Sequence, residues 1–186
     1  MWRAAIPGFD LDSLWAEGRT PWKASWSQLP PRTSKHGGAI PWEDEITAEV
    51  FTITSPDSAF DLEIDTYQAI TEYEGRVSVG GEPESRSALY DRRRNRETVL
   101  VFSGTMGAQE WGRWFGPRRF ALAGWRDASD MGHWKQGWLA IYSGSDSSVT
   151  TYVTRVVPTE AFERYRASWQ DWVAARYRVL KPRMRS

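Results

Sequence analysis

Hydrophobic residues recur at every second position over much of residues 46–157, and this spacing restricts the fold more than any other feature of the chain. Phe60, Leu62 and Ile64, for example, alternate with acidic residues. A period of two is typical of a β-strand with one buried face. About seven strands are expected, joined by short turns as a meander. They lie at residues 46–53, 59–67, 71–79, 97–102, 118–125, 137–142 and 148–157.

The strand at residues 97–102 differs from the others, because its sequence ETVLVF contains a continuous apolar run. Such runs are typical of strands that are buried on both faces. We therefore expect this strand to be buried on both faces.

A different spacing marks the C-terminal part of the chain. Apolar side chains recur there at three- and four-residue steps, which predicts one long amphipathic helix. They are Phe162, Tyr165, Trp169, Trp172, Val173 and Leu180. Glu160 near the start and Arg178 near the end suit the helix dipole, and Pro182 ends the helix. We expect this helix to pack on the sheet.

Residues 1–45 are expected to form a helical and loop arm, while residues 46–186 form a β-rich domain with the C-terminal helix. Thr20 and Pro21 are a good helix start, after which Trp22, Trp26 and Leu29 share one face. The fold class is then α+β: a bent antiparallel sheet with short N-terminal helices and one long C-terminal helix. The sheet and helix form either a helix-grip cup around a cavity or a solid sandwich with aromatic edges.

The chain has no cysteine, which excludes disulfides, thiolate metal sites and a cysteine nucleophile. Its start does not resemble a signal peptide, and no apolar run approaches the ~20 residues of a membrane span. We expect a soluble protein, cytoplasmic or viral, and the sequence does not decide the compartment.

The net charge of zero is the sum of two opposite segments. Residues 42–84 carry twelve acidic side chains and one basic residue, Arg76, whereas residues 85–186 carry eighteen basic and nine acidic side chains. The two segments either neutralise each other within one domain or attract the opposite segment of a second copy, which would speed and orient assembly. Nucleic acid is a less favoured partner for the C-terminal basic tail, because the pI is near neutral.

Residues 98–146 contain a motif that resembles the first strand-and-turn region of class 3 lipases. The stretch VLVFSGT is followed by Glu110 and Trp111 and later by the segment GWLAIYSGSD. The resemblance implies that backbone N–H groups near Gly104 and Thr105 form an oxyanion hole. Ser103 stands where the family has an arginine, and the chain contains no G-x-S-x-G motif. The stretch is interpreted as either a coincidence or a remnant without a nucleophile.

The two histidines do not predict a metal site. His133 follows Asp130 by three positions, but His36 is far away in the sequence, and a metal needs three or four ligands. We therefore predict no metal, no cofactor and no assigned catalytic residue.

The preferred function is a non-catalytic structural or interaction protein, such as a self-assembling coat or scaffold subunit that forms a homo-oligomer. Tryptophan is amphipathic and frequent at interfaces, and the chain has twelve. The predicted interface residues combine tryptophans of the N-terminal region with one arginine run: Trp22, Trp26, Arg92, Arg93 and Arg94.

An apolar-ligand cup is the alternative, with cyclase- or isomerase-like chemistry as one variant. Asp130 or Glu110 would act as acid or base in that variant. The pocket would be shaped by Trp111, Trp114, Trp134 and Trp138.

Overall fold

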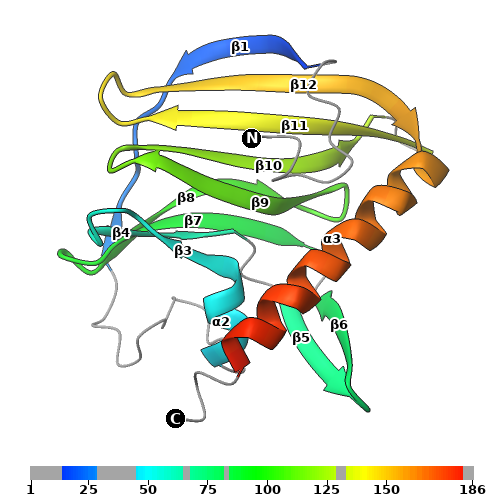
Figure 1. The fold of residues 1–186 in the computed structure, drawn as a ribbon. Coiled ribbons are helices and arrows are strands. Elements are labelled where there is room, and N and C mark those ends of the chain that lie inside the picture. The colour runs from blue at the N-terminus through cyan, green and yellow to red at the C-terminus, as the bar shows by residue number, and fades with distance from the viewer. Residues whose placement is uncertain (1–13, 29–44, 65–67, 82–83, 129–132, 182–186) are drawn as a thin grey trace.

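The computed structural model describes residues 14–28, 45–64, 68–81, 84–128 and 133–181, which form two five-stranded antiparallel sheets, a separate hairpin and two helices (Figure 1). The first sheet has the order β1-β12-β11-β10-β9. Its strands are β1 (Trp15–Pro21), β9 (Gly107–Gly116), β10 (Arg119–Asp127), β11 (Trp134–Ser143) and β12 (Ser148–Pro158). Strands β9 to β12 follow one another along the chain, as a meander requires.

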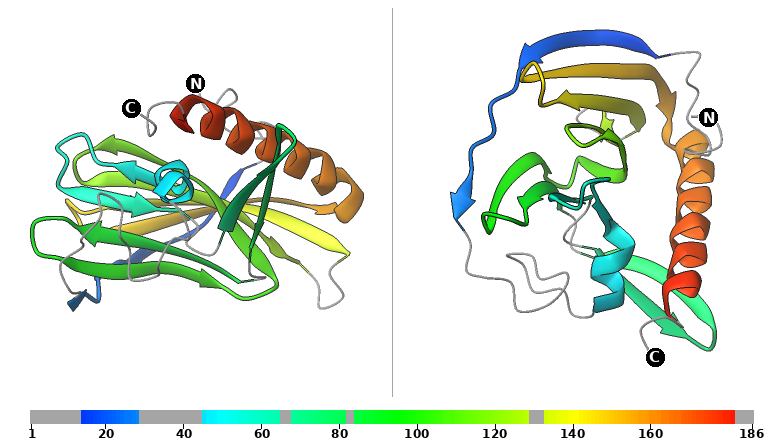
Figure 2. Two further views of the ribbon diagram at one scale, coloured as in Figure 1. Left: turned by 90° about the horizontal axis from the view of Figure 1, so that it is seen from below. Right: turned by 60° about the vertical axis from the view of Figure 1, so that its left-hand side comes forward.

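The second sheet has the order β2-β8-β7-β4-β3. Its strands are β2 (Ser27–Gln28), β3 (Thr52–Thr54), β4 (Phe60–Glu63), β7 (Ser85–Asp91) and β8 (Arg96–Ser103). The hairpin consists of β5 (Gln68–Tyr73) and β6 (Arg76–Gly81). Residues 15–28 contribute one edge strand to each sheet, so the connection between β1 and β2 spans one side of the two layers (Figure 2).

The predicted α+β class is confirmed in its coarse form, as antiparallel strands with a C-terminal helix. The described residues hold twelve strands rather than about seven. Residues 45–51 form helix α2 (Glu45–Phe51) rather than a strand, because their apolar side chains also fit a helical face. The predicted helix after Pro21 is wrong: residues 22–26 are irregular and lead into β2. Val99 and Phe102 of β8 are 48% and 56% exposed, so β8 is not buried on both faces.

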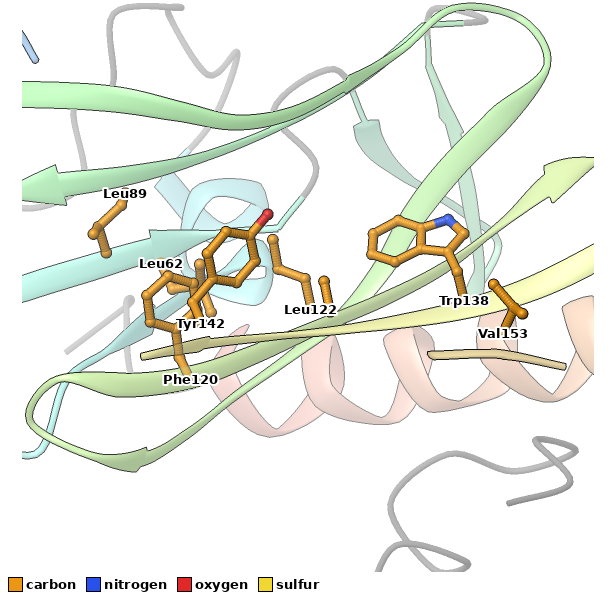
Figure 3. Packing of buried hydrophobic residues seen from close by; sticks show 8 residues of the cluster. Leu62, Leu89, Phe120, Leu122, Trp138, Tyr142 and Val153 are labelled. Carbon is orange, nitrogen blue, oxygen red and sulfur yellow. The ribbon is translucent and has the colours of Figure 1, made fainter. Parts of the chain in front are cut away.

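The main core lies between the two sheets. Its buried cluster contains Leu62 and Leu89 from the second sheet, while Phe120, Leu122 and Trp138 are among the members from the first. Figure 3 shows these side chains as a layer along the inner face of the sheets, with Phe120 near Leu62. Burial of apolar area at roughly 25 cal/mol per Å² makes this layer the main source of stability.

Helix α3 (Thr159–Leu180) leaves the end of β12 and reaches α2 and the β5–β6 hairpin (Figure 1). Near its start, Phe162 packs on Trp125 of β10 with ring centroids 5.0 Å apart. Further along, Trp169 and Val173 form a second buried cluster with Phe51 of α2 and Ile70 of β5. The predicted helix is therefore confirmed, and it packs on sheet, helix and hairpin. No helix in the described part of the chain is long and apolar enough to cross a membrane.

Candidate functional site

A cavity of about 810 Å³ opens at one end of the two sheets. The turns β3–β4, β7–β8, β9–β10 and β11–β12 meet at this end (Figure 1). The connection between β1 and β2 crosses the same end. The lining side chains come from residues 21–26, 57–60, 89–94, 114–120 and 144–147. Five segments that are distant in sequence therefore share one site.

Six aromatic side chains form a continuous series around the cavity, and five of them line it. In order of contact the series is Trp26, Phe60, Trp114, Phe120, Tyr142 and Trp22. Neighbouring ring centroids are 4.8 to 6.5 Å apart. These separations lie in the range of favourable aromatic pairs. The two sheets thus present one aromatic wall, which we call the aromatic series.

Polar contacts hold the rings of this series in place. The indole Nε1 of Trp114 donates a 2.8 Å hydrogen bond to the carbonyl oxygen of Ile53, which joins β9 to β3. The guanidinium of Arg96 lies 4.3 Å from the ring centroid of Trp26, a cation–π geometry. The backbone N–H of Trp22 donates to the carbonyl oxygen of Ser147 over 2.6 Å. The wall is therefore largely preformed.

Charged side chains surround the opening, and we call them the charged rim: Lys23, Asp57, Asp91, Arg93, Arg94 and Arg118. The two acids already have partners within the chain. The Oδ1 atom of Asp91 accepts the backbone N–H groups of Arg93 and Arg94, both at 3.2 Å, and its Oδ2 atom lies 3.1 Å from Nε of Arg96. Asp91 thus closes the β7–β8 turn.

Asp57 has a similar role in the β3–β4 turn. Its Oδ1 atom accepts hydrogen bonds from the Ser55 hydroxyl at 2.7 Å and from the backbone N–H of Ala59 at 3.2 Å. The Ser55 hydrogen bond, followed by that of Ala59, lowers the pKa of Asp57, and the charge of Arg93 adds to the effect. Both rim acids are therefore carboxylates with structural hydrogen bonds.

The basic side chains of the rim form fewer contacts within the protein than the two acids do. Arg94 lies 3.6 Å from Oδ2 of Asp91 and is 70% exposed. Lys23, Arg93 and Arg118 are exposed and form no ion pair with another of the described residues. The rim contains four basic and two acidic side chains, so its formal charge is positive.

The residues predicted as an interface gather at this cavity. Trp22, Trp26, Arg93 and Arg94 all line it. Arg92 is the exception, because its guanidinium lies 3.5 Å from Oδ1 of Asp61. Their proximity results from the crossing of residues 22–26 between the sheets, which sequence spacing alone does not show.

The four tryptophans predicted for a pocket lie in different places. Trp114 lines the cavity. Trp111 packs on the other face of the first sheet with Ala121 and Leu139. Trp138 belongs to the main core, and Trp134 is 47% exposed. Trp111 and Trp114 are three positions apart in β9, so the two-residue alternation places them on opposite faces of the sheet.

Sequence reasoning missed Phe60, Phe120, Tyr142 and Arg118. The alternation within the predicted strands places Phe60 and Phe120 on a buried face, but it does not show that the two strands end at the same opening. Arg118 follows Pro117 in a turn, and this is the one local signal that it is exposed at a strand end.

The candidate acid–base residues lie away from the cavity or outside the described residues. Glu110 is buried, and its Oε1 atom accepts a 3.0 Å hydrogen bond from Nε1 of Trp125. Asp130 and His36 lie outside the described residues. His133 is exposed at the opposite end of the sheets, before β11. The described residues contain no group of three His, Cys, Asp or Glu side chains that could hold a metal.

The lipase-like turn also lies at the opposite end. Gly104 and Thr105 connect β8 to β9, whereas the cavity is at the β9–β10 turn. Comparisons with protein-family models, curated proteins and solved structures gave no match. The geometry of the cavity is therefore the basis for assigning a function.

Proposed function

We propose that the protein binds a small apolar molecule in the cavity enclosed by the aromatic series. The observation that supports this most is the volume of about 810 Å³ together with five lining aromatic rings. Ligand sites typically measure about 300–1,000 Å³, with mostly apolar walls and a few polar groups. The proposal corresponds to the apolar-ligand cup, here placed at the end of a sandwich, and α3 contributes no side chain to its lining.

The chemistry of the wall favours binding to an aromatic or otherwise flat molecule. Trp22 and Trp26 are only partly buried, and neither indole N–H donates a hydrogen bond to another described residue. Each indole can therefore offer an aromatic face and a donor to a ligand. Leu89 and Phe120 are buried and supply the apolar floor.

The proposed activity is binding without catalysis. The titratable side chains of the described lining are lysine, arginine and the two aspartates of the rim. Asp57 and Asp91 are occupied by hydrogen bonds within their own turns. Acid–base catalysis needs a group that is free to reach a ligand, whereas both aspartates are held by hydrogen bonds in their own turns.

Titration with phenylnaphthylamine, an uncharged apolar fluorophore, tests the proposal. The wild-type chain is expected to bind one equivalent, with a rise in fluorescence. Ala24 lines the cavity, so Ala24→Trp fills it without removing a wall residue and should abolish binding. Ala16→Trp places the same bulk on the exposed strand β1 and should leave binding unchanged. Equal binding by both variants, or no binding by the wild-type chain, would overturn the proposal.

Self-assembly is a second candidate, and one observation favours it. Strand β1 lies at the end of its sheet's strand order, all seven of its residues are exposed, and Trp15 is 49% exposed. Edge strands with free backbone groups can pair with another chain. Against charge-driven assembly, Arg92–Asp61 and Lys181–Glu72 pair the basic and acidic segments within one chain.

Sedimentation at low and high salt tests self-assembly. Association through the charged segments should weaken as salt rises, because exposed charges are screened beyond ~8 Å at physiological ionic strength. Association through β1 should persist at high salt and be lost in Trp15→Lys. A single monomeric species at every salt concentration would exclude both forms.

A further inference from the structure

We infer that the ligand of this cavity is an aromatic anion, whose ring system enters the aromatic series and whose charged group stays at the rim near Arg93 and Arg118. The inference rests on the proposed function and specifies the class of ligand. It depends on how charge and exposure are distributed over the lining.

The lining divides into an apolar interior and a basic opening. Phe120 and Leu89 are buried, whereas Lys23, Arg93 and Arg118 are exposed at the outer boundary of the same cavity. A molecule with one apolar and one charged end therefore has a single favourable orientation. Its apolar end leaves water, and its charged end remains partly hydrated.

The sign of the ligand's charge follows from which rim side chains already have partners within the protein. The carboxylates of Asp57 and Asp91 accept hydrogen bonds from backbone N–H groups of their own turns. These contacts stabilise the turns and would be lost if the carboxylates turned to a ligand. The guanidinium of Arg118 has no acidic partner among the described residues, while Arg93 acts on Asp57 only through its charge. An anion gains charge-assisted hydrogen bonds here, and a cation would meet like charges.

The two arginines are anchored by neighbouring backbone contacts. Arg93 sits in the turn that Asp91 closes. Arg118 accepts, through its carbonyl oxygen, a 2.8 Å hydrogen bond from the backbone N–H of Gly144. Because β7–β8 belongs to one sheet and β9–β10 to the other, the two guanidiniums approach the opening from both layers. Arginine is suited to this role, since its planar group matches carboxylates, sulfonates and phosphates.

A pair of matched fluorophores tests the inference. Anilinonaphthalene sulfonate has the ring system of phenylnaphthylamine with one added sulfonate. The wild-type chain is expected to bind the sulfonate about tenfold more tightly than the uncharged compound, which is the usual effect of one charge-assisted hydrogen bond. The preference should shrink as salt rises, because the rim is exposed.

Variants then locate the anion. The double variant Arg93→Gln with Arg118→Gln should lose the preference for the sulfonate and keep its affinity for phenylnaphthylamine. Arg155→Gln removes an exposed arginine outside the lining and should leave both affinities unchanged. Near-ultraviolet circular dichroism checks that each variant remains folded.

The outcomes separate this inference from the function on which it rests. Equal wild-type affinity for the two compounds, or an unchanged preference in the double variant, would overturn the inference that the ligand is an anion. The proposal that the cavity binds an apolar molecule would still stand. Binding of neither compound would overturn both.

Discussion

The indole Nε1 of Trp169 donates a 2.8 Å hydrogen bond to the carbonyl oxygen of Glu110, which connects α3 to a bulge in β9. Trp111 pairs with Ala123 in β10, and Gln109 pairs with the next residue, Gly124, so Glu110 is the extra residue of β9. A bulge interrupts the regular ladder of backbone hydrogen bonds. The helix supplies a donor at this interruption.

Trp169→Phe should therefore lower the free energy of unfolding by about 1–3 kcal/mol, because a buried carbonyl loses its donor while most of the packing remains. Trp169→Ala should cost about 3–5 kcal/mol, since it also leaves a cavity. Urea denaturation measures both effects. Trp134→Phe is the matched control, as Trp134 is 47% exposed, and its effect should stay within about 0.5 kcal/mol. Equal stability of Trp169→Phe and Trp134→Phe would contradict the role of this bond.

Gly124 is constrained by close contact with the neighbouring strand. A Cβ atom at this position would lie 1.9 Å from the carbonyl oxygen of Ala108 and 2.9 Å from Cζ2 of Trp138. Gly124→Ala should therefore destabilise the fold by about 3 kcal/mol or more, because β9 and β10 must separate. A Cβ atom at Gly18 would meet nothing within 4 Å, so Gly18→Ala is the control. Similar urea midpoints for the two variants would show that β10 can adjust.

Sequence patterns predicted an element correctly where the spacing of its apolar residues matches the face that the fold buries. The C-terminal helix is one, because its apolar stripe contacts the buried cluster around Phe51 and the ring of Trp125. Residues 45–51 are the opposite case. Val50 and Phe51 fit a strand in isolation, yet the helix lets both side chains reach Trp169 and its neighbours in α3. Packing against α3 determines that residues 45–51 are helical, and their short sequence pattern does not report that contact.

The site was less predictable than the fold. Trp22, Trp26, Arg93 and Arg94 stood out in the sequence, but as parts of a surface for another chain. Their place in one cavity depends on the chain crossing from the first sheet to the second after Pro21. No local signal reports such a crossing, since it follows from the pairing of β1 with β12 and of β2 with β8.

Asp91 links the stability of the rim to the shape of the cavity. Its carboxylate holds Arg96, and Arg96 lies over Trp26. Asp91→Ala should lower the free energy of unfolding by about 1–3 kcal/mol, because three donors lose a common acceptor. It should also weaken binding of phenylnaphthylamine, as the orientation of Trp26 is no longer fixed. Arg155→Ala removes an exposed arginine outside the lining and should change the stability by at most about 0.5 kcal/mol without affecting that binding. Wild-type affinity in Asp91→Ala would show that Trp26 is held by other contacts.

Tyr142 provides a pH-dependent test of the core behind the cavity. Its ring stacks on Phe120 with centroids 4.8 Å apart, and Figure 3 shows the two rings side by side. Burial raises the pKa of Tyr142 from 10.0 to about 12, because the phenolate would lose its hydration inside the protein. The folded chain therefore keeps this proton at a pH where the unfolded chain releases it.

Stability should consequently fall as the pH rises from 10 towards 12, because deprotonation favours the unfolded state over that interval. The pKa difference corresponds to a loss of up to about 2–3 kcal/mol in the free energy of unfolding. Tyr142→Phe should remove this part of the decline, while Tyr73→Phe should not, since Tyr73 is 75% exposed. Urea denaturation of the three proteins across this pH range provides the comparison. Parallel curves for the wild-type chain and Tyr142→Phe would mean that the phenol ionises in the folded protein as readily as in water, and that the core beside the cavity admits solvent.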